Sequence, residues 1–381
     1  MEVLTSQIRT LYAEANEAGR QSIQAQLRDL QTSLDTDWDL AIRIGSGNIQ
    51  GSLIKIGQNL SLFTILSTTS GPLTLSNLSS TTKCAPKLLS HLLRALSAFG
   101  FITEVSSSLY TSNRLTNLFA NEHISGAITH IYDCHFPVAH VFPTWLEERG
   151  YKDITSNKDL PFQRAMGTEM TPFEWMKAHP EHLASLGHTM AFQREGQWFE
   201  SYAPVSEETK TFAETGEEEK VLLVDVGGGF GQQASAFRKN FAEVKGRVVV
   251  QDIQQTLAHV AKVEGVEFEA HDFFTEQPIK GAKYYYLRNI LHDWTDEDSV
   301  NILRAITPAM GPESRIVIDE VVLPDEKLSW QAAYMDITMM TCLGGIERTK
   351  TEYESLLDAA GLKLLDMRKY GFSSVVLAVP K

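Results

Sequence analysis

The chain has 381 residues and a formal net charge of −14, so it has room for two or three domains and is acidic overall. This charge argues against binding to nucleic acid or to anionic membranes, because phosphate groups select basic surfaces. No apolar run approaches the roughly 18 residues of a membrane span, the N-terminus is too polar for a signal peptide, and three widely spaced cysteines (Cys84, Cys134 and Cys342) indicate free thiols in a reducing cytoplasm.

The first 120 residues are predicted to form a mostly helical domain. Residues 1–34 carry apolar side chains at helical spacing, and this stripe packs either on its own domain or against a partner chain. Three short helices are expected between residues 51 and 100, and a small β-hairpin follows over residues 101–111.

Helices followed by a hairpin are typical of a winged-helix module, which often reads DNA. Along the last of these helices only Lys87 and Arg94 are permanently positive, so DNA binding is disfavoured. The module also lacks an obvious ligand motif. We predict instead that residues 1–110 form the interface of a homodimer.

Residues 121–210 are predicted to form a helical segment that connects the two domains and lines a substrate pocket. His130, His135 and His140 recur every five residues, which does not place ligands on one helix face, and the chain has no H-E-x-x-H or C-x-x-C motif. We therefore predict no metal site. We expect His130, His135 and Arg194 to be polar groups of the pocket wall, with core packing as the alternative for the histidines.

The stretch Val221–Gly231 is the one around which the rest of the chain is organised. An apolar run into Asp225 predicts a buried parallel strand, and glycines at 227, 228, 229 and 231 allow a tight turn that a ligand can approach closely. The glycines alone also fit a dinucleotide motif, which leaves NAD as an alternative. The acidic Asp225 disfavours a pyrophosphate and favours S-adenosylmethionine, so Asp225, Gly227, Gly229 and Gly231 are predicted to hold this cofactor.

Residues 211–381 are predicted to form an α/β domain with a doubly wound, Rossmann-like sheet, because strands and helices alternate after the glycine turn. Ligands of such sheets bind beyond the carboxyl ends of the strands. Asp252, at the end of the second strand, is placed to accept hydrogen bonds from ribose hydroxyls. Asp272 and Phe273, after the third, suit an adenine ring.

The sharpest polar cluster follows the fourth strand and contains His292. An imidazole has the unperturbed pKa that suits proton transfer near neutrality, and methyl transfer to a phenol benefits from a base that takes its proton. Glu320 and Glu347 are candidates to orient this imidazole, with a purely structural role for His292 as the alternative. We interpret Asp293 and Asp296 as helix-capping groups. We interpret Trp294 first as a packing residue. Trp294 and Met339 are also candidates for contact with the substrate.

The chain resembles caffeate-type O-methyltransferases, most closely the fungal secondary-metabolite branch, and the N-terminal module resembles that family's dimerisation domain. The resemblance covers essentially the whole chain and rests on motifs in the family's order: Asp225-x-Gly-x-Gly-x-Gly231, Gln251-Asp252, His271-Asp272-Phe273-Phe274, Arg288-x-x-Leu-His-Asp-Trp294, Asp319-Glu320-x-x-Leu-Pro324 and Gly345-x-Glu-Arg-Thr349. It implies that His292 is the general base, flanked by Glu320 and Glu347. It also implies cofactor contacts from Gly227, Asp252, Asp272, Phe273 and Arg288.

Two departures from the family prevent any transfer of substrate specificity. Lysine often stands where this chain has Arg288, and the loop expected between Asp336 and Gly345 is one residue shorter than in plant members. Some fungal members of this family use bound S-adenosylmethionine only as a fixed positive charge and catalyse dehydration or pericyclic ring closure. O-methylation is the preferred hypothesis because His292, Glu320 and Glu347 are all present. A pericyclase or dehydratase is the alternative, and the acidic charge disfavours a binding-only repressor.

Overall fold

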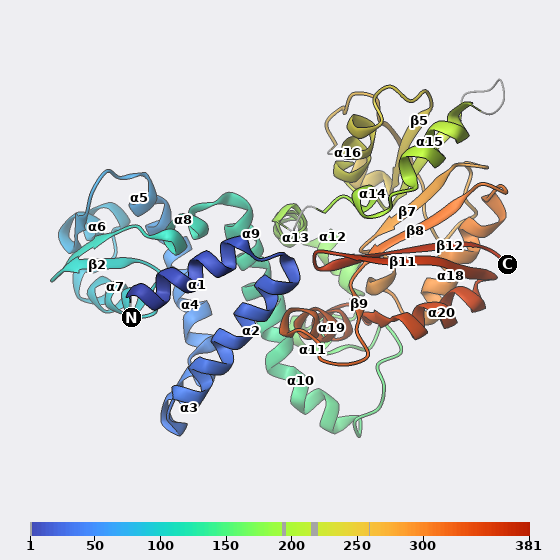
Figure 1. Ribbon diagram of the computed structural model, residues 1–381. Coiled ribbons are helices and arrows are strands. Elements are labelled where there is room, and N and C mark those ends of the chain that lie inside the picture. Colours follow the sequence, from blue (N-terminus) through green and yellow to red (C-terminus); the bar gives the residue numbers. More distant parts are fainter. Residues whose placement is uncertain (1, 193–195, 215–219, 259) are drawn as a thin grey trace. The chain divides into compact units, whose positions relative to one another are not determined.

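A computed structural model describes residues 2–192, 196–214, 220–258 and 260–381. The chain forms two compact units (Figure 1). Unit 1 comprises Met1–Phe136 and Pro180–Gln193, and unit 2 comprises Pro137–His179 and Arg194–Lys381. The segment 121–210, expected as one connecting element, is therefore divided between the two units.

Unit 1 is mostly helical and contains the expected winged-helix arrangement. Its helices alternate with a small antiparallel sheet in the order β1-β3-β2, and their apolar faces bury a core that includes Leu62, Phe63, Leu89 and Tyr110. The elements are α1 (Glu2–Glu14), α2 (Glu17–Leu34), α3 (Asp37–Gly45), α4 (Gly47–Asn59), α5 (Leu62–Thr68), β1 (Leu73–Thr74), α6 (Leu75–Thr82), α7 (Pro86–Ala98), β2 (Thr103–Ser106), β3 (Leu109–Thr111), α8 (Arg114–Ala120), α9 (Glu122–His130), the π-helix η1 (Ile131–His135) and α13 (Pro180–Phe192).

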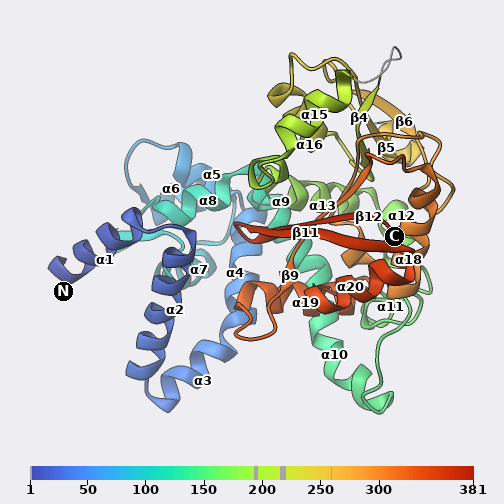
Figure 2. The ribbon, with the colours of Figure 1, turned by 45° about the vertical axis from the view of Figure 1, so that its right-hand side comes forward.

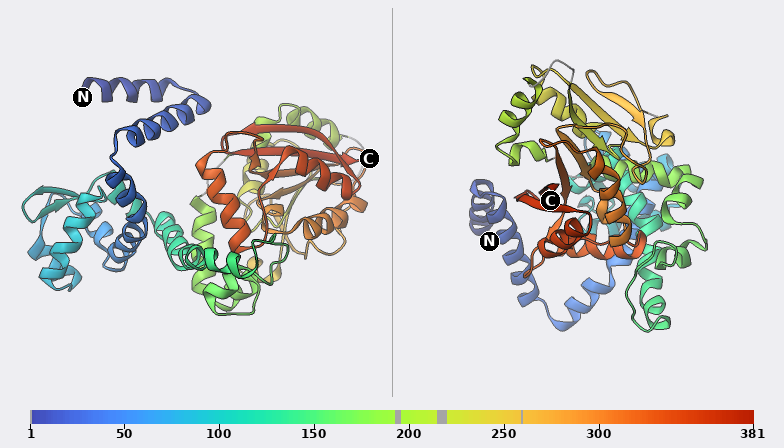
Figure 3. Two further views of the ribbon diagram at one scale, coloured as in Figure 1. Left: turned by 90° about the horizontal axis from the view of Figure 1, so that it is seen from below. Right: turned by 90° about the vertical axis from the view of Figure 1, so that its right-hand side faces the viewer.

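The N-terminal apolar stripe does not pack into the core of unit 1. Helices α1 and α2 follow one another across a short turn (Figure 3), and α1 has no buried residue among those described. Its Leu11 is 60% exposed, and on α2 Leu27, Leu30 and Leu34 are 41% to 75% exposed. The sequence left two alternatives for this stripe, packing on its own domain or against a partner chain. The exposure of these side chains in unit 1 contradicts the first alternative.

Unit 2 is built on a seven-stranded sheet in the order β11-β12-β8-β7-β4-β5-β6. The five strands β8, β7, β4, β5 and β6 are parallel, whereas β12 pairs antiparallel with both β8 and β11. The long pair β11–β12 is drawn in red in Figure 2. The alternation of strands and helices expected after the glycine turn is present, and the strands of the sheet are β4 (Val221–Val226), β5 (Arg247–Asp252), β6 (Glu267–Ala270), β7 (Tyr284–Arg288), β8 (Arg315–Glu320), β11 (Leu362–Tyr370) and β12 (Ser373–Pro380).

Each face of this sheet carries its own core, because successive side chains of a strand point to opposite faces. On β7, Tyr284 and Tyr286 belong to one core with Trp198, whereas Tyr285 and Leu287 belong to the other. The helical elements of the unit are α10 (Phe136–Glu148), α11 (Pro161–Met166), α12 (Pro172–Ala178), α14 (Trp198–Ser201), α15 (Val205–Glu214), α16 (Gln232–Asn240), α17 (Gln254–Leu257), η2 (Leu291–Asp293), α18 (Asp296–Ile306), η3 (Thr307–Ala309), α19 (Trp330–Cys342) and α20 (Lys350–Ala359). Two short strands, β9 (Val322–Leu323) and β10 (Arg348–Thr349), pair in parallel.

The loop expected between Asp336 and Gly345 is largely helical, and this prediction was wrong. Helix α19 starts behind Ser329, whose side chain accepts a hydrogen bond from the backbone N–H of Ala332, and it continues to Cys342. The helix ends where Gly344 takes a positive φ of 82°.

In the described part of the chain, no helix is long and apolar enough to cross a membrane.

The two cores, one on each face of the sheet, give a direct test of the sheet assignment. Leu377→Ala is expected to lower the free energy of unfolding by about 2–5 kcal/mol, because it removes a fully buried side chain and leaves a cavity. Leu365 is 48% exposed and lies between Leu364 and Asp366, which pair with β12. We expect Leu365→Ala to change the free energy of unfolding by less than about 0.5 kcal/mol. Urea unfolding followed by circular dichroism measures both. Equal losses would contradict the assignment of Leu377 to the core.

Candidate active site

The glycine turn after β4 lies at the switch point of the sheet, because β4 is paired with β5 on one side and with β7 on the other. The N–H groups of Gly227 and Gly228 donate to the carbonyl of Gln251, at 2.7 and 3.1 Å. Gly227 has a φ of 70°, and a Cβ there would lie 2.6 Å from Cδ1 of Ile290. Only glycine therefore lets the turn pass this close to the segment after β7.

Asp225 is buried beneath this turn, with 2% of its surface exposed. Burial raises the pKa of its carboxyl group to about 7, and Oδ2 has no hydrogen-bond partner among the described residues. Nearly all buried acceptors in proteins are paired, so this oxygen marks a place where a ligand's donor group would be satisfied.

Three more predicted cofactor residues gather at the same edge of the sheet. Asp252 accepts hydrogen bonds from the N–H groups of Gly229 and Ile253, at 2.9 and 2.8 Å. Asp272 accepts one from the N–H of Phe274 at 3.0 Å, and the ring of Phe273 lies 3.6 Å from where a Cβ on Gly227 would stand. Carboxylates and an aromatic ring around a glycine turn fit a ligand with hydroxyl and amine donors and a flat base, such as S-adenosylmethionine.

Arg288, the last residue of β7, is tied to two neighbouring groups. Its Nη1 donates to the carbonyl of Gly196 at 3.1 Å and lies 3.8 Å from Oδ2 of Asp319. Asp319 in turn accepts hydrogen bonds from the hydroxyls of Tyr286 and Tyr370, at 2.6 and 2.5 Å. This buried network anchors Gly196 to the sheet. The cofactor contact expected from Arg288 stays a prediction.

His292 lies in the short 3-10 helix η2 and is buried between two carboxylates. Its Nδ1 is 2.8 Å from Oε1 of Glu347, and its Nε2 is 3.4 Å from Oδ1 of Asp293. His292 is 4% exposed and Glu347 2%. The predicted pairing of His292 with Glu347 is therefore present in the geometry, across 55 residues of sequence.

The charge state of His292 differs from the near-neutral base expected from sequence. Burial alone would lower the pKa of the imidazole, but the negative charges of Asp293, Glu347 and Glu320 outweigh this effect and raise it to about 10. Burial raises the pKa of Asp293 to about 7, although the nearby imidazolium opposes this shift. At neutral pH the arrangement therefore holds an imidazolium beside Glu347 and a partly ionised Asp293.

Two acidic residues have roles that the sequence did not reveal. Glu320 contacts the backbone of η2 and not the imidazole ring: its Oε1 accepts hydrogen bonds from the N–H groups of Ile290 and Leu291, at 3.0 and 2.6 Å. Asp293 is not a helix cap, because Thr295 caps α18 through the N–H of Asp298. Its position directly after His292 was the signal that could have identified it as a partner of the ring.

Trp294 is half-buried in a group of aromatic rings in unit 2. Its ring centroid lies 4.8 Å from that of Phe274 and 5.8 Å from that of Phe173, which is nearly parallel to it at 20°. Met339, on α19, is also half-buried. Phe173 and Phe274 were not predicted as site residues, although Phe274 directly follows Phe273 in the motif.

The other predicted substrate contacts lie elsewhere in the chain. His130 and His135 belong to unit 1, where their ring centroids are 4.9 Å apart. Burial lowers the pKa of His130 to about 4 and that of His135 to about 3, so both are neutral, and Nδ1 of His130 has no partner among the described residues. Arg194 lies outside the described residues. No group of three or more metal-binding side chains occurs in the described ranges.

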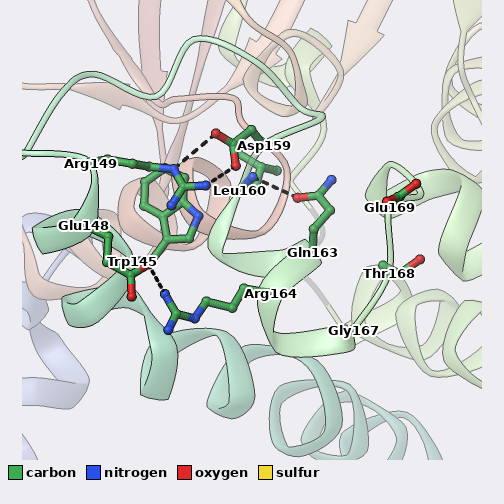
Figure 4. A pocket seen from close by; sticks show the side chains of 10 residues that line it. All are labelled: Trp145, Glu148, Arg149, Asp159, Leu160, Gln163, Arg164, Gly167, Thr168 and Glu169. Carbon is green, nitrogen blue, oxygen red and sulfur yellow. Dashed lines mark hydrogen bonds and ion pairs between the residues drawn. The ribbon is translucent and has the colours of Figure 1, made fainter.

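A cavity of about 440 Å³ in unit 2 contains none of the predicted site residues (Figure 4). Arg149 stacks on Trp145 and pairs with Asp159, while Arg164 pairs with Glu148 at 2.5 Å. Both arginines that line it thus already have a carboxylate partner. We therefore place the candidate site at the carboxyl edge of the sheet and not in this cavity.

Comparison with known proteins identifies the family of the chain. The family profile described as an O-methyltransferase domain matches residues 152–363, and the O-methyltransferase dimerisation domain matches residues 47–122. The chain is 45% identical to a demethylsterigmatocystin 6-O-methyltransferase of Aspergillus parasiticus, over 100% of this chain and 98% of that protein.

Two solved structures, both 32% identical and covering all of this chain, are similar throughout. One is titled a pericyclic reaction enzyme (TM-score 0.94, 99% of that chain), and the other is LepI in complex with S-adenosylmethionine (TM-score 0.93, 98% of that chain). S-adenosylmethionine is accordingly the cofactor of this family. The chain belongs to the family of S-adenosylmethionine-dependent O-methyltransferases that carry an N-terminal dimerisation domain.

Proposed function

We propose that the chain methylates a hydroxyl group of a small aromatic or polyketide-like secondary metabolite, with His292 as the group that takes the proton. The observation that carries this proposal is the buried pair of His292 and Glu347 at the carboxyl edge of the sheet, 2.8 Å apart. The 45% identity to an enzyme named for methylation of demethylsterigmatocystin supports the substrate class.

When bound, S-adenosylmethionine supplies an activated methyl group, which leaves sulfur and forms a bond to the acceptor oxygen. Glu347 holds Nδ1 of His292, so Nε2 is the nitrogen that receives the proton of the hydroxyl. The pKa of His292, about 10, lies close to the ~10 of a phenol, so this transfer needs little driving force. Asp293 and Glu347 then stabilise the imidazolium that forms, as a carboxylate does in a hydrolase triad.

Substrate binding is proposed for unit 2, where Trp294 and Met339 would contact the flat ring system. The assignment of His130, His135 and Arg194 to polar groups of the substrate stays a prediction from the sequence. We also propose a cytoplasmic location, which the three free cysteines support.

A second candidate function is dehydration or pericyclic ring closure with S-adenosylmethionine as an unconsumed positive charge. The specific observation in its favour is the raised pKa of His292, because an imidazolium at neutral pH can donate a proton to a departing hydroxyl. The likeness to the pericyclic reaction enzyme, at 32% identity over the whole chain, supports it as well.

His292→Ala is expected to lower the rate of methyl transfer by about 10²–10⁴-fold and to leave cofactor affinity almost unchanged, because the proton acceptor is lost. The assay incubates purified protein with methyl-labelled cofactor and a panel of hydroxylated polyketides and pyridones. Label in the product supports methylation. An unlabelled product with unconsumed cofactor would favour the second candidate, and wild-type methylation by His292→Ala would rule out the assignment of the base.

The pH dependence of kcat separates His292 from the substrate's own ionisation. Only neutral His292 accepts a proton, so the rate is expected to rise between about pH 7 and 10, as the imidazolium loses its proton. Glu347 is one of the carboxylates that raise this pKa, so Glu347→Gln should move the rising limb to lower pH, whatever it does to the maximal rate. The ionisation of a phenol does not depend on Glu347. A limb that stays in place in Glu347→Gln therefore contradicts the assignment.

We further propose that the chain is a homodimer held by residues 1–110. The match of residues 47–122 to the dimerisation domain and the exposed apolar side chains of α1 and α2 support this interface. Light scattering should report twice the 42.5 kDa chain mass. Leu27→Glu combined with Leu30→Glu should shift the protein towards monomer, whereas Thr32→Glu, outside the leucine stripe of the same helix, should not. A wild-type monomer at micromolar concentration refutes the proposal.

A further inference from the structure

The turn that carries His292 is held through its backbone, independently of the ring. Glu320, at the end of β8, accepts hydrogen bonds through Oε1 from three consecutive N–H groups, those of Ile290 (3.0 Å), Leu291 (2.6 Å) and His292 (3.3 Å). Asn289 begins this segment and has a φ of 51°. This value lies in the left-handed region, which residues other than glycine adopt uncommonly. The surroundings of the turn therefore determine its conformation.

Tyr353 on α20 completes the hydrogen bonding of Glu320. Its hydroxyl donates to Oε2, the oxygen that does not contact the backbone of the turn. Tyr353 is fully buried, and burial raises its pKa well above 10, so the hydroxyl remains a donor at every physiological pH. Both oxygens of Glu320 are thus occupied, and the carboxylate has one orientation.

Arg348 holds the same turn through its carbonyl groups. Its Nη1 donates to the carbonyl of Leu291 at 2.9 Å and its Nη2 to that of Trp294 at 3.0 Å, while Nε donates to Asp296 at 2.9 Å. The side chain of Arg348 is completely buried. A guanidinium suits this task because its planar set of donors reaches several acceptors at once, which an ammonium group cannot do.

The segment that carries Arg348 also carries Glu347 and is pressed against the turn. A Cβ on Gly345 would lie 1.9 Å from the carbonyl oxygen of His292, so only glycine permits this approach. One short segment thus supplies the close backbone contact, the carboxylate on Nδ1 of His292 and the guanidinium on the carbonyls of the turn.

We infer that Tyr353 and Arg348 are positioning residues for the reaction at His292: Tyr353, through Glu320, fixes the N–H groups of the turn, and Arg348 fixes its carbonyl groups. This inference rests on the proposed role of His292. Its physical basis is that a displacement of about 1 Å at a reacting group costs on the order of 10²-fold in rate. Neither residue touches the reacting atoms, so each acts through the geometry of the turn.

The test compares two pairs of matched variants in the full-length protein. Tyr353→Phe is paired with Tyr285→Phe, another fully buried tyrosine, whose hydroxyl donates to the carbonyls of Ile279 and Ala309 away from the turn. Arg348→Lys is paired with Arg238→Lys, because Arg238 also binds backbone carbonyls, those of Val244 and Gly246. Each control variant removes side-chain hydrogen bonds to backbone carbonyls at a place away from the turn.

Two measurements are made on all four variants: kcat and KM for the cofactor, and hydrogen exchange of a peptide that spans residues 288–296. We expect Tyr353→Phe and Arg348→Lys to lower kcat by about 10–100-fold, with KM for the cofactor within about twofold, and to speed exchange in this peptide. We expect Tyr285→Phe and Arg238→Lys to change neither kcat nor this exchange.

Hydrogen exchange separates a failure of this inference from a failure of the proposed function. If both members of a pair lower kcat equally, or if exchange of the peptide does not change, Tyr353 and Arg348 do not position the turn. If exchange rises while kcat stays at the wild-type value, the inference is also overturned. In that case His292→Ala decides whether the proposed role of His292 fails with it.

Discussion

The contact between Nδ1 of His292 and Oε1 of Glu347 depends on elements that the fold brings together from distant parts of the chain. His292 follows β7, and Glu347 precedes β10, which pairs with β9 beyond the end of β8. Burial makes the contact strong, because the same low-dielectric surroundings that disfavour an isolated charge increase the attraction between opposite charges. The negative charges of Asp293, Glu347 and Glu320 together raise the pKa of this imidazole from its ordinary value of about 6.5 to about 10.

This electrostatic arrangement connects the two candidate functions. A group with a pKa near that of a phenol can accept a phenolic proton, and the same group, protonated at neutral pH, can donate one. The predicted cofactor residues are the same for both chemistries: the glycine turn, buried Asp225, Asp252 and the aromatic Phe273 would bind the cofactor whether or not its methyl group is consumed. The two proposals differ in whether His292 takes a proton from the substrate or gives one to it.

Much of unit 2 could be predicted from sequence because its signals are local. Strands β4, β5 and β8 each contain a run of consecutive apolar residues, and the glycine turn is recognisable within eleven residues from Val221 to Gly231. The strand-end rule then placed Asp252 and Asp272 at one edge of the sheet. Glu320 and Glu347 were candidates to orient His292 because a catalytic imidazole needs a carboxylate partner, and the family resemblance then implied that both flank it.

The charge of His292 and the roles of its acidic neighbours depend on contacts that no local sequence pattern encodes. The pKa of His292 results from carboxylates on three separate segments, so the near-neutral base expected from sequence was wrong. Glu320 was expected to orient the imidazole of His292, yet the three-dimensional structure shows that it binds backbone N–H groups instead. Asp293 was assigned to helix capping because aspartate often caps helices, but Thr295 performs that role two residues later.

The claim on which this account depends is that His292 is a buried imidazole whose charge is set by Asp293, Glu347 and Glu320. It can be measured in the cofactor-free protein by carbon-13 labelling of the histidine rings, with the His292 resonance assigned from its loss in His292→Gln. The account predicts that this ring stays protonated through neutral pH and titrates near pH 10. Titration of His292 near its ordinary value of about 6.5 would contradict it.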